Sequence, residues 1–161
     1  MPIEELMTRQ VEYCAPEDSL QHAAQLMWQH DCGCIPVCSC VEGVHRVVGV
    51  ITDRDICMCA LFQRKALGDL RVSDAMGKDL HACQPGDSVE TAQSLMRTAK
   101  VRRLPVLDAQ GRLCGLIALA DLARAATRQA SSAPQVISES EVGDTLAAIC
   151  VSHAGAPAAA P

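Results

Sequence analysis

The pattern of apolar and polar residues predicts a helix, a hairpin and a second helix in the first part of the chain. Four apolar residues recur at helical spacing after the turn signal of residues 16–19: Leu20, Ala23, Ala24 and Met27. Gly33 is expected to end this helix. The β-branched runs 35–37 and 47–51 flank the turn-rich residues 39–46, which is typical of a hairpin. A second helix is expected from about residue 53 to residue 65.

The second part of the chain predicts the same elements in the same order. A helix is expected from Asp87 and Ser88 to about Thr98, and strands at 104–107 and 113–117 flank a turn. A last helix is expected from about residue 119 to residue 128. With a short leading strand, each half is β-α-β-β-α. The remainder is rich in Ala, Pro and Ser, and we expect one short helix near 142–150 and a loose end.

The two halves are copies of one another. Displacing the sequence by 69 positions superimposes identical residues, among them Met7 on Met76 and Pro36 on Pro105. Beyond the hairpin the displacement becomes 66, and Asp55 then meets Asp121. The three lost residues fall in a loop, where a change of length has little entropic cost. We therefore predict an α+β fold of two units related by pseudo-twofold symmetry, at residues 5–68 and 69–130, with a tail at 131–161.

Composition and charge exclude several classes of partner. The chain of 161 residues is 49% hydrophobic and 20% charged, enough to bury a core. Its three aromatic residues are Tyr13, Trp28 and Phe62, which argues against a protein that stacks nucleic-acid bases. The net charge of −5 has the wrong sign for binding a phosphate backbone. No segment predicts a membrane span or a signal peptide, so a cytoplasmic location with reduced thiols is expected.

Short motifs recur in both copies. The first copy contains Met7-Thr8, Ile35-Pro36-Val37 and residues 49–55, and the second contains Ala75-Met76 and residues 102–108 and 115–121. In this order they resemble the cystathionine-β-synthase (CBS) domain pair, or Bateman module, over about residues 5–128. The resemblance implies two units packed sheet to sheet, with clefts that bind adenosine-containing ligands such as AMP, ADP, ATP or S-adenosylmethionine. It also implies a homodimer, for which the helix faces at 56–62 and 122–126 are the candidate surfaces.

Within this resemblance, Thr52 and Asp55 are the candidate ribose-binding residues. A carboxylate accepts bonds from two adjacent hydroxyls, and the helix N-terminus with Arg54 suits a phosphate. Val50, Ile51 and Val11 are predicted to form an apolar slot for adenine, and Pro36 of the strand motif completes the predicted ligand-binding residues of this unit. The spacing Thr52-x-x-Asp55 is also that of a capping box, in which both side chains bond to the helix's own backbone. Both interpretations remain open from the sequence.

The second unit departs from this pattern. It retains Asp121, but Ala118 stands where the first unit has Thr52, so the second cleft is expected to be weaker or empty. We predict one working site per chain. Arg103, preceded by Arg102, matches a family position that reaches the ligand's phosphates, although a solvated surface pair would have the same sequence. Cys34 is its counterpart in the first unit, so the basic lining is one-sided and favours AMP, ADP or a sulfonium nucleoside.

Ten cysteines allow a different function. They include three C-x-C pairs (32/34, 38/40 and 57/59), which could form a Zn²⁺ or Cu(I) site or sense redox state. Free cysteine is equally a small core hydrophobe in a chain with few aromatic residues. His30 lies two residues before Cys32 and is the one histidine placed to join such a site. No metal ligand or catalytic residue is assigned from these patterns.

The sequence thus predicts a regulatory module that senses an adenosyl nucleotide and passes its occupancy to a protein partner. No catalytic motif is present, so no catalysis and no required cofactor are expected. The alternatives are a cysteine-based metal or redox sensor, a protein-interaction module that binds no ligand, and, last, a small enzyme.

Overall fold

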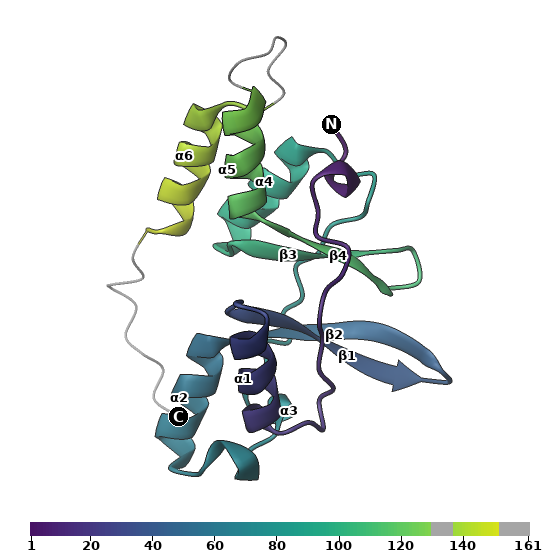
Figure 1. Cartoon of the computed structure of the whole chain (residues 1–161), viewed down its shortest axis with the longest axis vertical. Coiled ribbons are helices and arrows are strands. Elements are labelled where there is room, and N and C mark those ends of the chain that lie inside the picture. The colour runs from purple at the N-terminus through teal and green to yellow at the C-terminus, as the bar shows by residue number, and fades with distance from the viewer. Residues whose placement is uncertain (130–136, 152–161) are drawn as a thin grey trace.

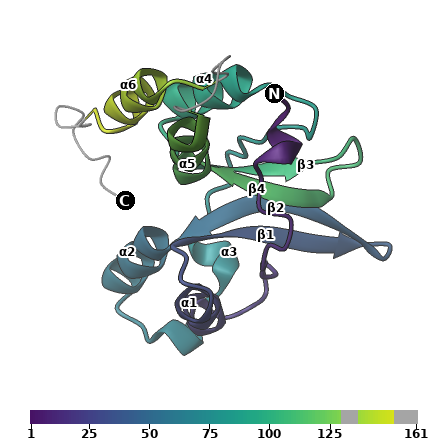
Figure 2. The same cartoon turned by 45° about the horizontal axis from the view of Figure 1, so that its top comes forward.

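The computed structural model describes residues 1–129 and 137–151 and contains two similar α+β units. In each unit, two helices pack on one side of a two-stranded antiparallel hairpin, and the two hairpins face each other (Figure 1, Figure 2). The first unit contains α1 (Leu20–Gln29), β1 (Cys34–Val41), β2 (Val44–Thr52) and α2 (Asp53–Gln63). The second contains α4 (Val89–Ala99), β3 (Arg103–Leu107), β4 (Leu113–Ala118) and α5 (Leu119–Gln129).

The remaining elements are short, apart from α6 (Glu139–Ile149). They are two 3₁₀ turns, Ile3–Glu5 and Leu67–Asp69, and the single-turn helix α3 (Val72–Ala75). The expected leading strands are reduced to single parallel bridges, in which Cys14 pairs with Val37 and Cys83 with Val106. No helix in the described ranges has the length and apolar character needed to cross a bilayer.

Each unit contributes its first residues to the other unit. Thr8 pairs with Leu116 of β4, and Gly77 pairs with Val50 of β2. The hydrophobic cores follow the same exchange. Ile3 is buried in the core of the second unit, and its counterpart Val72 is buried in the core of the first. The repeat predicted from the sequence is therefore tied together by two crossing segments at equivalent positions.

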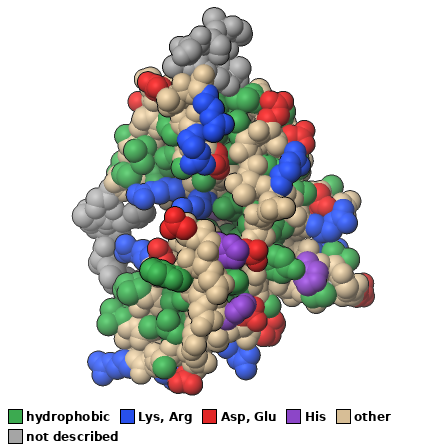
Figure 3. All heavy atoms as spheres, viewed as in Figure 1, with side chains coloured by type: hydrophobic (Ala, Val, Ile, Leu, Met, Phe, Trp, Pro, Cys, Tyr) green, Lys and Arg blue, Asp and Glu red, His purple; other side chains and the backbone are tan. Residues whose placement is uncertain are grey.

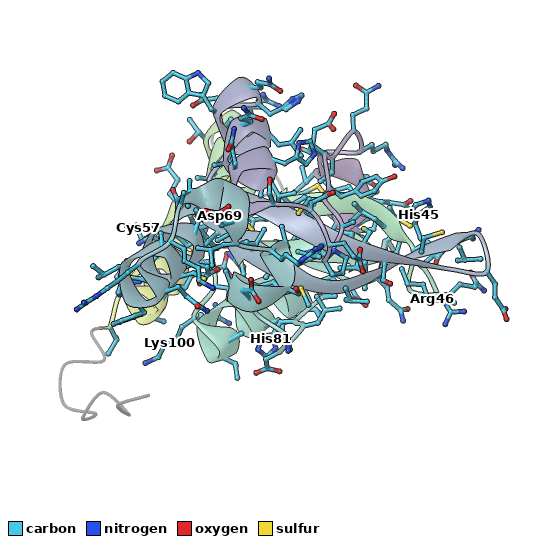
Figure 4. All side chains as sticks on the ribbon, turned by 90° about the horizontal axis from the view of Figure 1, so that it is seen from below. His45, Arg46, Cys57, Asp69, His81 and Lys100 are labelled. Atoms are coloured by element: carbon cyan, nitrogen blue, oxygen red, sulfur yellow. The ribbon has the colours of Figure 1, made fainter. Side chains whose placement is uncertain are left out.

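Two predicted boundaries in the first unit were wrong. Residues 39–46 form the outer part of the hairpin, and only Glu42 and Gly43 turn, with φ of 52° and 78°. A two-residue turn of this conformation matches the twist of paired strands. The polar residues misled the prediction because this part of the hairpin projects from the body, with His45 and Arg46 at its outer end (Figure 4). The first helix ends at Gln29, and the chain turns at Asp31, with φ of 48°, before it reaches Gly33.

The helix expected in the tail forms and belongs to the second core. Ser138 caps α6 by accepting a hydrogen bond from the Glu141 backbone, and Ile137, Thr145 and Ile149 are buried. The helix packs on α4 and α5. The face at residues 122–126, predicted as a dimer surface, is consequently internal: Leu122 is fully buried. The loose end expected for the tail lies outside the described residues.

The closest approach of the two units depends on glycines. A Cβ on Gly49 would lie 2.3 Å from the carbonyl oxygen of Gly77, and one on Gly115 would lie 2.7 Å from that of Thr8. These backbone atoms cannot move aside without breaking the bridges that join the units. We expect Gly49→Ala to lower the free energy of unfolding by about 2 kcal/mol or more in urea denaturation. Gly86→Ala is the control, because its Cβ would meet open space. Equal stability of the two variants would contradict this account of the crossing.

Two equivalent thiols in the cores make stability depend on alkaline pH. Burial raises the pKa of Cys14 to about 12 and that of Cys83 to about 11 from 9.0, and nearby Asp18 and Asp87 add to the rise. Between the ordinary pKa of 9.0 and the raised values, the folded chain retains thiol protons that the unfolded chain has lost. The free energy of unfolding therefore falls as pH rises from about 9. Their contribution is complete below pH 9.

We expect the double variant Cys14→Val/Cys83→Val to show a shallower loss of stability between pH 9 and 11 than the parent. Urea unfolding at stepped pH measures this slope. Cys57→Ser is the control, since Cys57 is exposed, and it should keep the parent slope. An unchanged slope in the double variant would show that these thiols do not carry the effect.

Candidate functional site

The strand β2 passes directly into helix α2, and Thr52 is the cap between them. The Thr52 hydroxyl accepts a hydrogen bond from the Asp55 backbone N–H at 3.2 Å. In return, Asp55 Oδ2 accepts from the Thr52 backbone N–H at 2.9 Å and from the Thr52 hydroxyl at 2.7 Å. The structure therefore contains the capping box that was one of the two interpretations of this motif.

The cap leaves part of the motif available. Both Thr52 and Asp55 are half-buried, and Asp55 Oδ2 already accepts two bonds. No described residue donates to Oδ1 of Asp55. One carboxylate oxygen can thus accept a ligand hydroxyl while the cap persists, and a second hydroxyl must compete with the Thr52 hydroxyl for Oδ2.

Beside this cap, a cleft of about 880 Å³ lies between the two units. Both units contribute to its walls: Gly33, Cys34, Val50, Thr52, Asp53 and Arg54 from the first, and Lys100, Val101, Arg102 and Arg103 from the second. Ile149 of α6 completes the described lining. Of the predicted ligand-binding residues, the structure brings Val50, Thr52, Arg54 and Arg103 together here.

The other predicted site residues lie elsewhere. Asp55 bonds to Thr52 and is not part of the lining. Ile51 is fully buried in the first core, and Pro36 is buried opposite Val50 in the hairpin. Val11 lines a separate hollow of about 360 Å³, together with Tyr13. The cleft therefore lacks the apolar slot expected from the sequence, except for Val50.

The cleft has a basic lining from both sides. Arg54 stands at the start of α2, and Lys100, Arg102 and Arg103 follow the end of α4. Lys100 has a φ of 55°, so the chain turns sharply there and carries the basic run into the cleft. Asp53 is the acidic residue of the described lining. The expectation of a one-sided basic lining was wrong because Arg54, on the first unit, reaches the same cleft.

The end of α6 forms a wall that local sequence patterns do not reveal. Ile149 is buried and faces the cleft. Arg102 Nη2 donates to the Cys150 sulfur at 3.5 Å, and Arg97 Nη1 donates to the Thr145 hydroxyl at 3.0 Å. The basic segment of the cleft is thereby linked to the C-terminal helix. Lys100 could have been predicted from the charged run it begins, whereas the docking of α6 is a tertiary contact.

The equivalent cap of the second unit has no free carboxylate oxygen. Asp121 Oδ2 accepts from the Ala118 backbone N–H at 2.8 Å, and Oδ1 pairs with the Arg124 guanidinium. Only 11% of the Asp121 side chain is exposed. Each oxygen of Asp121 therefore already accepts one bond within its own unit, and one working site per chain stays a prediction.

The cysteines do not assemble a metal site in the described part of the chain, where no group of three or more potential ligands converges. Burial raises the pKa of Cys34 and of Cys38 to about 11, and for Cys34 this effect exceeds the opposing charge of Arg103. These thiols are protonated at neutral pH and lack thiolate reactivity. Cys38 is buried and Cys40 exposed, because the hairpin leaves the body between them. His30 lies near Glu12, with 3.9 Å between Nε2 and Oε1.

Known proteins share both the sequence and the fold. The CBS domain family model matches residues 3–60 and 72–128. The CBS domain-containing protein YhcV of Bacillus subtilis is 40% identical over 121 residues, which cover 75% of this chain and 82% of that protein. Hypoxic Response Protein I, whose structure was solved with two coordinated zinc ions, has 27% sequence identity to this chain. Its structure matches with a TM-score of 0.68 over 77% of this chain and 98% of that one.

A third comparison concerns the CBS domain pair of protein MJ0100, solved in complex with 5-methylthioadenosine and S-adenosyl-L-methionine. It is 21% identical, with a TM-score of 0.67, and the match covers 77% of this chain and 98% of that chain. At this identity the likeness concerns the fold. The CBS family model matches both units, and YhcV is 40% identical to this chain. The chain therefore belongs to the CBS domain family, as a CBS pair.

Proposed function

We propose that this CBS pair is a regulatory module that binds one phosphate-bearing adenosine nucleotide in the cleft between its units and catalyses no reaction. The observation that carries the proposal is the convergence of Arg54, Lys100, Arg102 and Arg103 from both units around one cleft of about 880 Å³. In Figure 3, Lys and Arg side chains gather on the left of the molecule, between its upper and lower halves. The volume is within the range of small-molecule sites. Regulation is the role of CBS pairs in general, and stand-alone CBS proteins such as YhcV are similar to this chain.

The residues suggest how the ligand is oriented. The ribose lies against Thr52, and the phosphate lies toward Arg102 and Arg103. Because Asp55 lies outside the lining, its Oδ1 receives a ribose hydroxyl only when the first turn of α2 moves toward the cleft. The N-terminus of α2, with its free N–H groups and positive dipole end, adds to the attraction of an anion. Guanidinium groups donate paired bonds to phosphate oxygens. The ligand thereby connects the two units.

The charge of the cleft distinguishes among adenosyl ligands. S-adenosylmethionine carries a positive sulfonium, which four basic side chains disfavour. AMP, ADP or ATP instead places negative charge among them. Arg54 makes the basic lining two-sided, so the earlier reason for preferring a sulfonium nucleoside does not apply. Phosphate-bearing nucleotides are therefore the proposed class.

A population shift transmits occupancy. A nucleotide that contacts Arg54 on one unit and Arg103 on the other stabilises the orientation in which both reach it, by as much as its affinity for the two orientations differs. Arg102 connects the cleft with α6. It lines the cleft and donates a hydrogen bond to the sulfur of Cys150, which caps the end of α6. A phosphate that recruits Arg102 changes the contact that holds the end of α6.

We expect calorimetric titration to show one AMP, ADP or ATP bound per chain, and weaker binding of S-adenosylmethionine. Arg102→Met/Arg103→Met should weaken nucleotide binding about 10-fold or more, because each charge-assisted bond contributes roughly 1.5–3 kcal/mol. Asp121→Asn should leave the affinity unchanged, since that carboxylate is already engaged by its own unit.

A comparison of Thr52→Ala with a second cap variant separates nucleotide binding from helix capping. Thr52→Ala should weaken nucleotide binding several-fold and also lower stability by about 1 kcal/mol through loss of the cap. Ser88→Ala is the matched control, because Ser88 caps α4 in the same way and lies outside the cleft. It should lower stability without changing the affinity. If none of the four ligands binds the parent chain, the nucleotide proposal fails, and the module is one of protein interaction.

A further inference from the structure

The first hairpin is longer than the second. Its strands β1 and β2 contain eight and nine residues, whereas β3 and β4 contain five and six. The Val47 backbone N–H donates to the Gly111 carbonyl oxygen at 3.1 Å, so the first hairpin is joined to the turn of the second. The outer end of the first hairpin, with His45 and Arg46, lies beyond this bond (Figure 4). Its extra length gives the first unit a surface that the repeat does not require.

A hollow of about 360 Å³ lies beside this outer end, and three segments form its walls. They are the stretch before α1 (Arg9, Val11 and Tyr13), the first hairpin (Cys38, Gly43, Val44 and His45) and the start of β4 with the residue before it (Arg112 and Leu113). The rings of Tyr13 and His45 connect the first two segments, with their centroids 5.8 Å apart. The volume is within the range of small-molecule sites.

The hollow is not part of the plan that the two copies share. Ala82 stands where the first unit has Tyr13, and the three residues that the second copy lacks belong to the first hairpin. The hollow is also separate from the cleft of the proposed function, because the two have no lining residue in common. A ligand of this hollow would therefore be recognised by features specific to the first unit.

The charged side chains of this lining are basic. The Glu4 carbonyl oxygen accepts a hydrogen bond from Arg9 Nη2 at 3.0 Å, and Asp108 Oδ2 accepts one from Arg112 Nε at 2.6 Å. Neither acidic residue lines the hollow. No described residue accepts a bond from Nη1 of either arginine. Two guanidinium groups are thus held at the hollow with donors available to an anion.

The rest of the wall is mostly apolar or aromatic. Val11, Val44 and Leu113 are half-buried, and Tyr13 is 45% exposed. Burial raises the pKa of the Cys38 thiol to about 11, so this side chain is uncharged at neutral pH. An inorganic ion would leave the apolar surface in contact with water, whereas a ligand with an apolar body would cover it. The lining therefore suits an organic anion.

We propose that this hollow binds a small organic anion with one apolar ring, whose anionic head is held by Arg9 and Arg112. The ring of the ligand packs against Val11, Val44 and Leu113. Guanidinium groups bind carboxylates and phosphates through the same paired bonds, so the class is defined by one anionic head and one ring. The bound ligand connects the first hairpin with β4 of the second unit. The proposal does not depend on nucleotide binding in the cleft.

Tyr13 is the single tyrosine of the chain, so its ring signals in proton NMR report directly on the hollow. Benzoate and phenyl phosphate are the aromatic anions to be titrated into the full chain. Benzyl alcohol, which lacks the charge, and inorganic phosphate, which lacks the ring, are the comparison compounds. At least one aromatic anion should shift the Tyr13 signals saturably and bind about fivefold or more tightly than both comparison compounds. The tighter of the two anions identifies the preferred head group.

Two variants and a control locate the ligand. Val44→Glu should abolish binding, because it places a carboxylate in the wall beside the anion. Arg112→Met should weaken binding about fivefold. Arg46→Met should keep the parent affinity, since Arg46 is exposed on the same strand as Val44 and does not line the hollow. Circular dichroism and urea unfolding of each variant confirm that the fold is retained.

The proposal is wrong if neither aromatic anion moves the Tyr13 signals, or if Val44→Glu and Arg46→Met bind the anion equally well. It is also wrong if Arg102→Met/Arg103→Met abolishes the effect, because the anion would then occupy the nucleotide cleft. A failure of the calorimetric titrations with nucleotides leaves this proposal intact, since the two sites share no lining residue.

Discussion

The structure depends on the contact of backbone with backbone where each unit enters the sheet of the other. Gly77 lies against Gly49 and Val50, and Thr8 lies against Gly115 and Leu116, at the same place in the two copies. Because Gly49, Gly77 and Gly115 carry no side chain at these crossings, the hairpins approach closely. Their closeness brings the start of α2 and the basic residues after α4 to one cleft. The exchange of segments is therefore the condition for a site that contains residues of both units.

Prediction from the sequence succeeded where periodicity and repetition are strong. The α+β fold and the order of its elements followed from apolar spacing and from the displacement of 69 residues, because core residues such as Ile3 and Val72 obey the same constraint in both copies. It failed where solvent or tertiary contacts decide. The outer hairpin is polar because it projects, and the docking of α6 through Ile149 leaves no local pattern. For the site, motif position identified Thr52, Arg54 and Arg103, but spacing alone could not show that Val11 faces another hollow.

The cap at Thr52 and Asp55 completes the start of α2 and leaves one carboxylate oxygen without a described donor. The two interpretations of the motif are compatible in part, since Oδ2 completes the helix start and Oδ1 has no described donor. A ligand that takes both oxygens must replace the hydroxyl bond of Thr52, and a bond exchanged for a bond contributes little net free energy. Under the proposed function, most of the affinity of a nucleotide must therefore come from charge, that is, from the basic residues that both units place at the cleft.

The two copies share one fold but differ in which of their surfaces are covered by other parts of the chain. In the second unit, Arg124 neutralises Asp121 and α6 covers the helix groove, so both surfaces are satisfied within the chain. In the first unit, no described residue donates to Oδ1 of the corresponding Asp55, and the corresponding groove between α1 and α2 is lined by Trp28 and Asp31. The second unit serves as the anchor, and it supplies the basic residues of the cleft. The first unit leaves the corresponding surfaces open among the described residues. Helix α2 connects these surfaces, because its first turn borders the nucleotide cleft and its outer face borders the groove. A displacement of α2 would therefore change the cleft and the groove together, which is the condition for coupling between two sites on one helix.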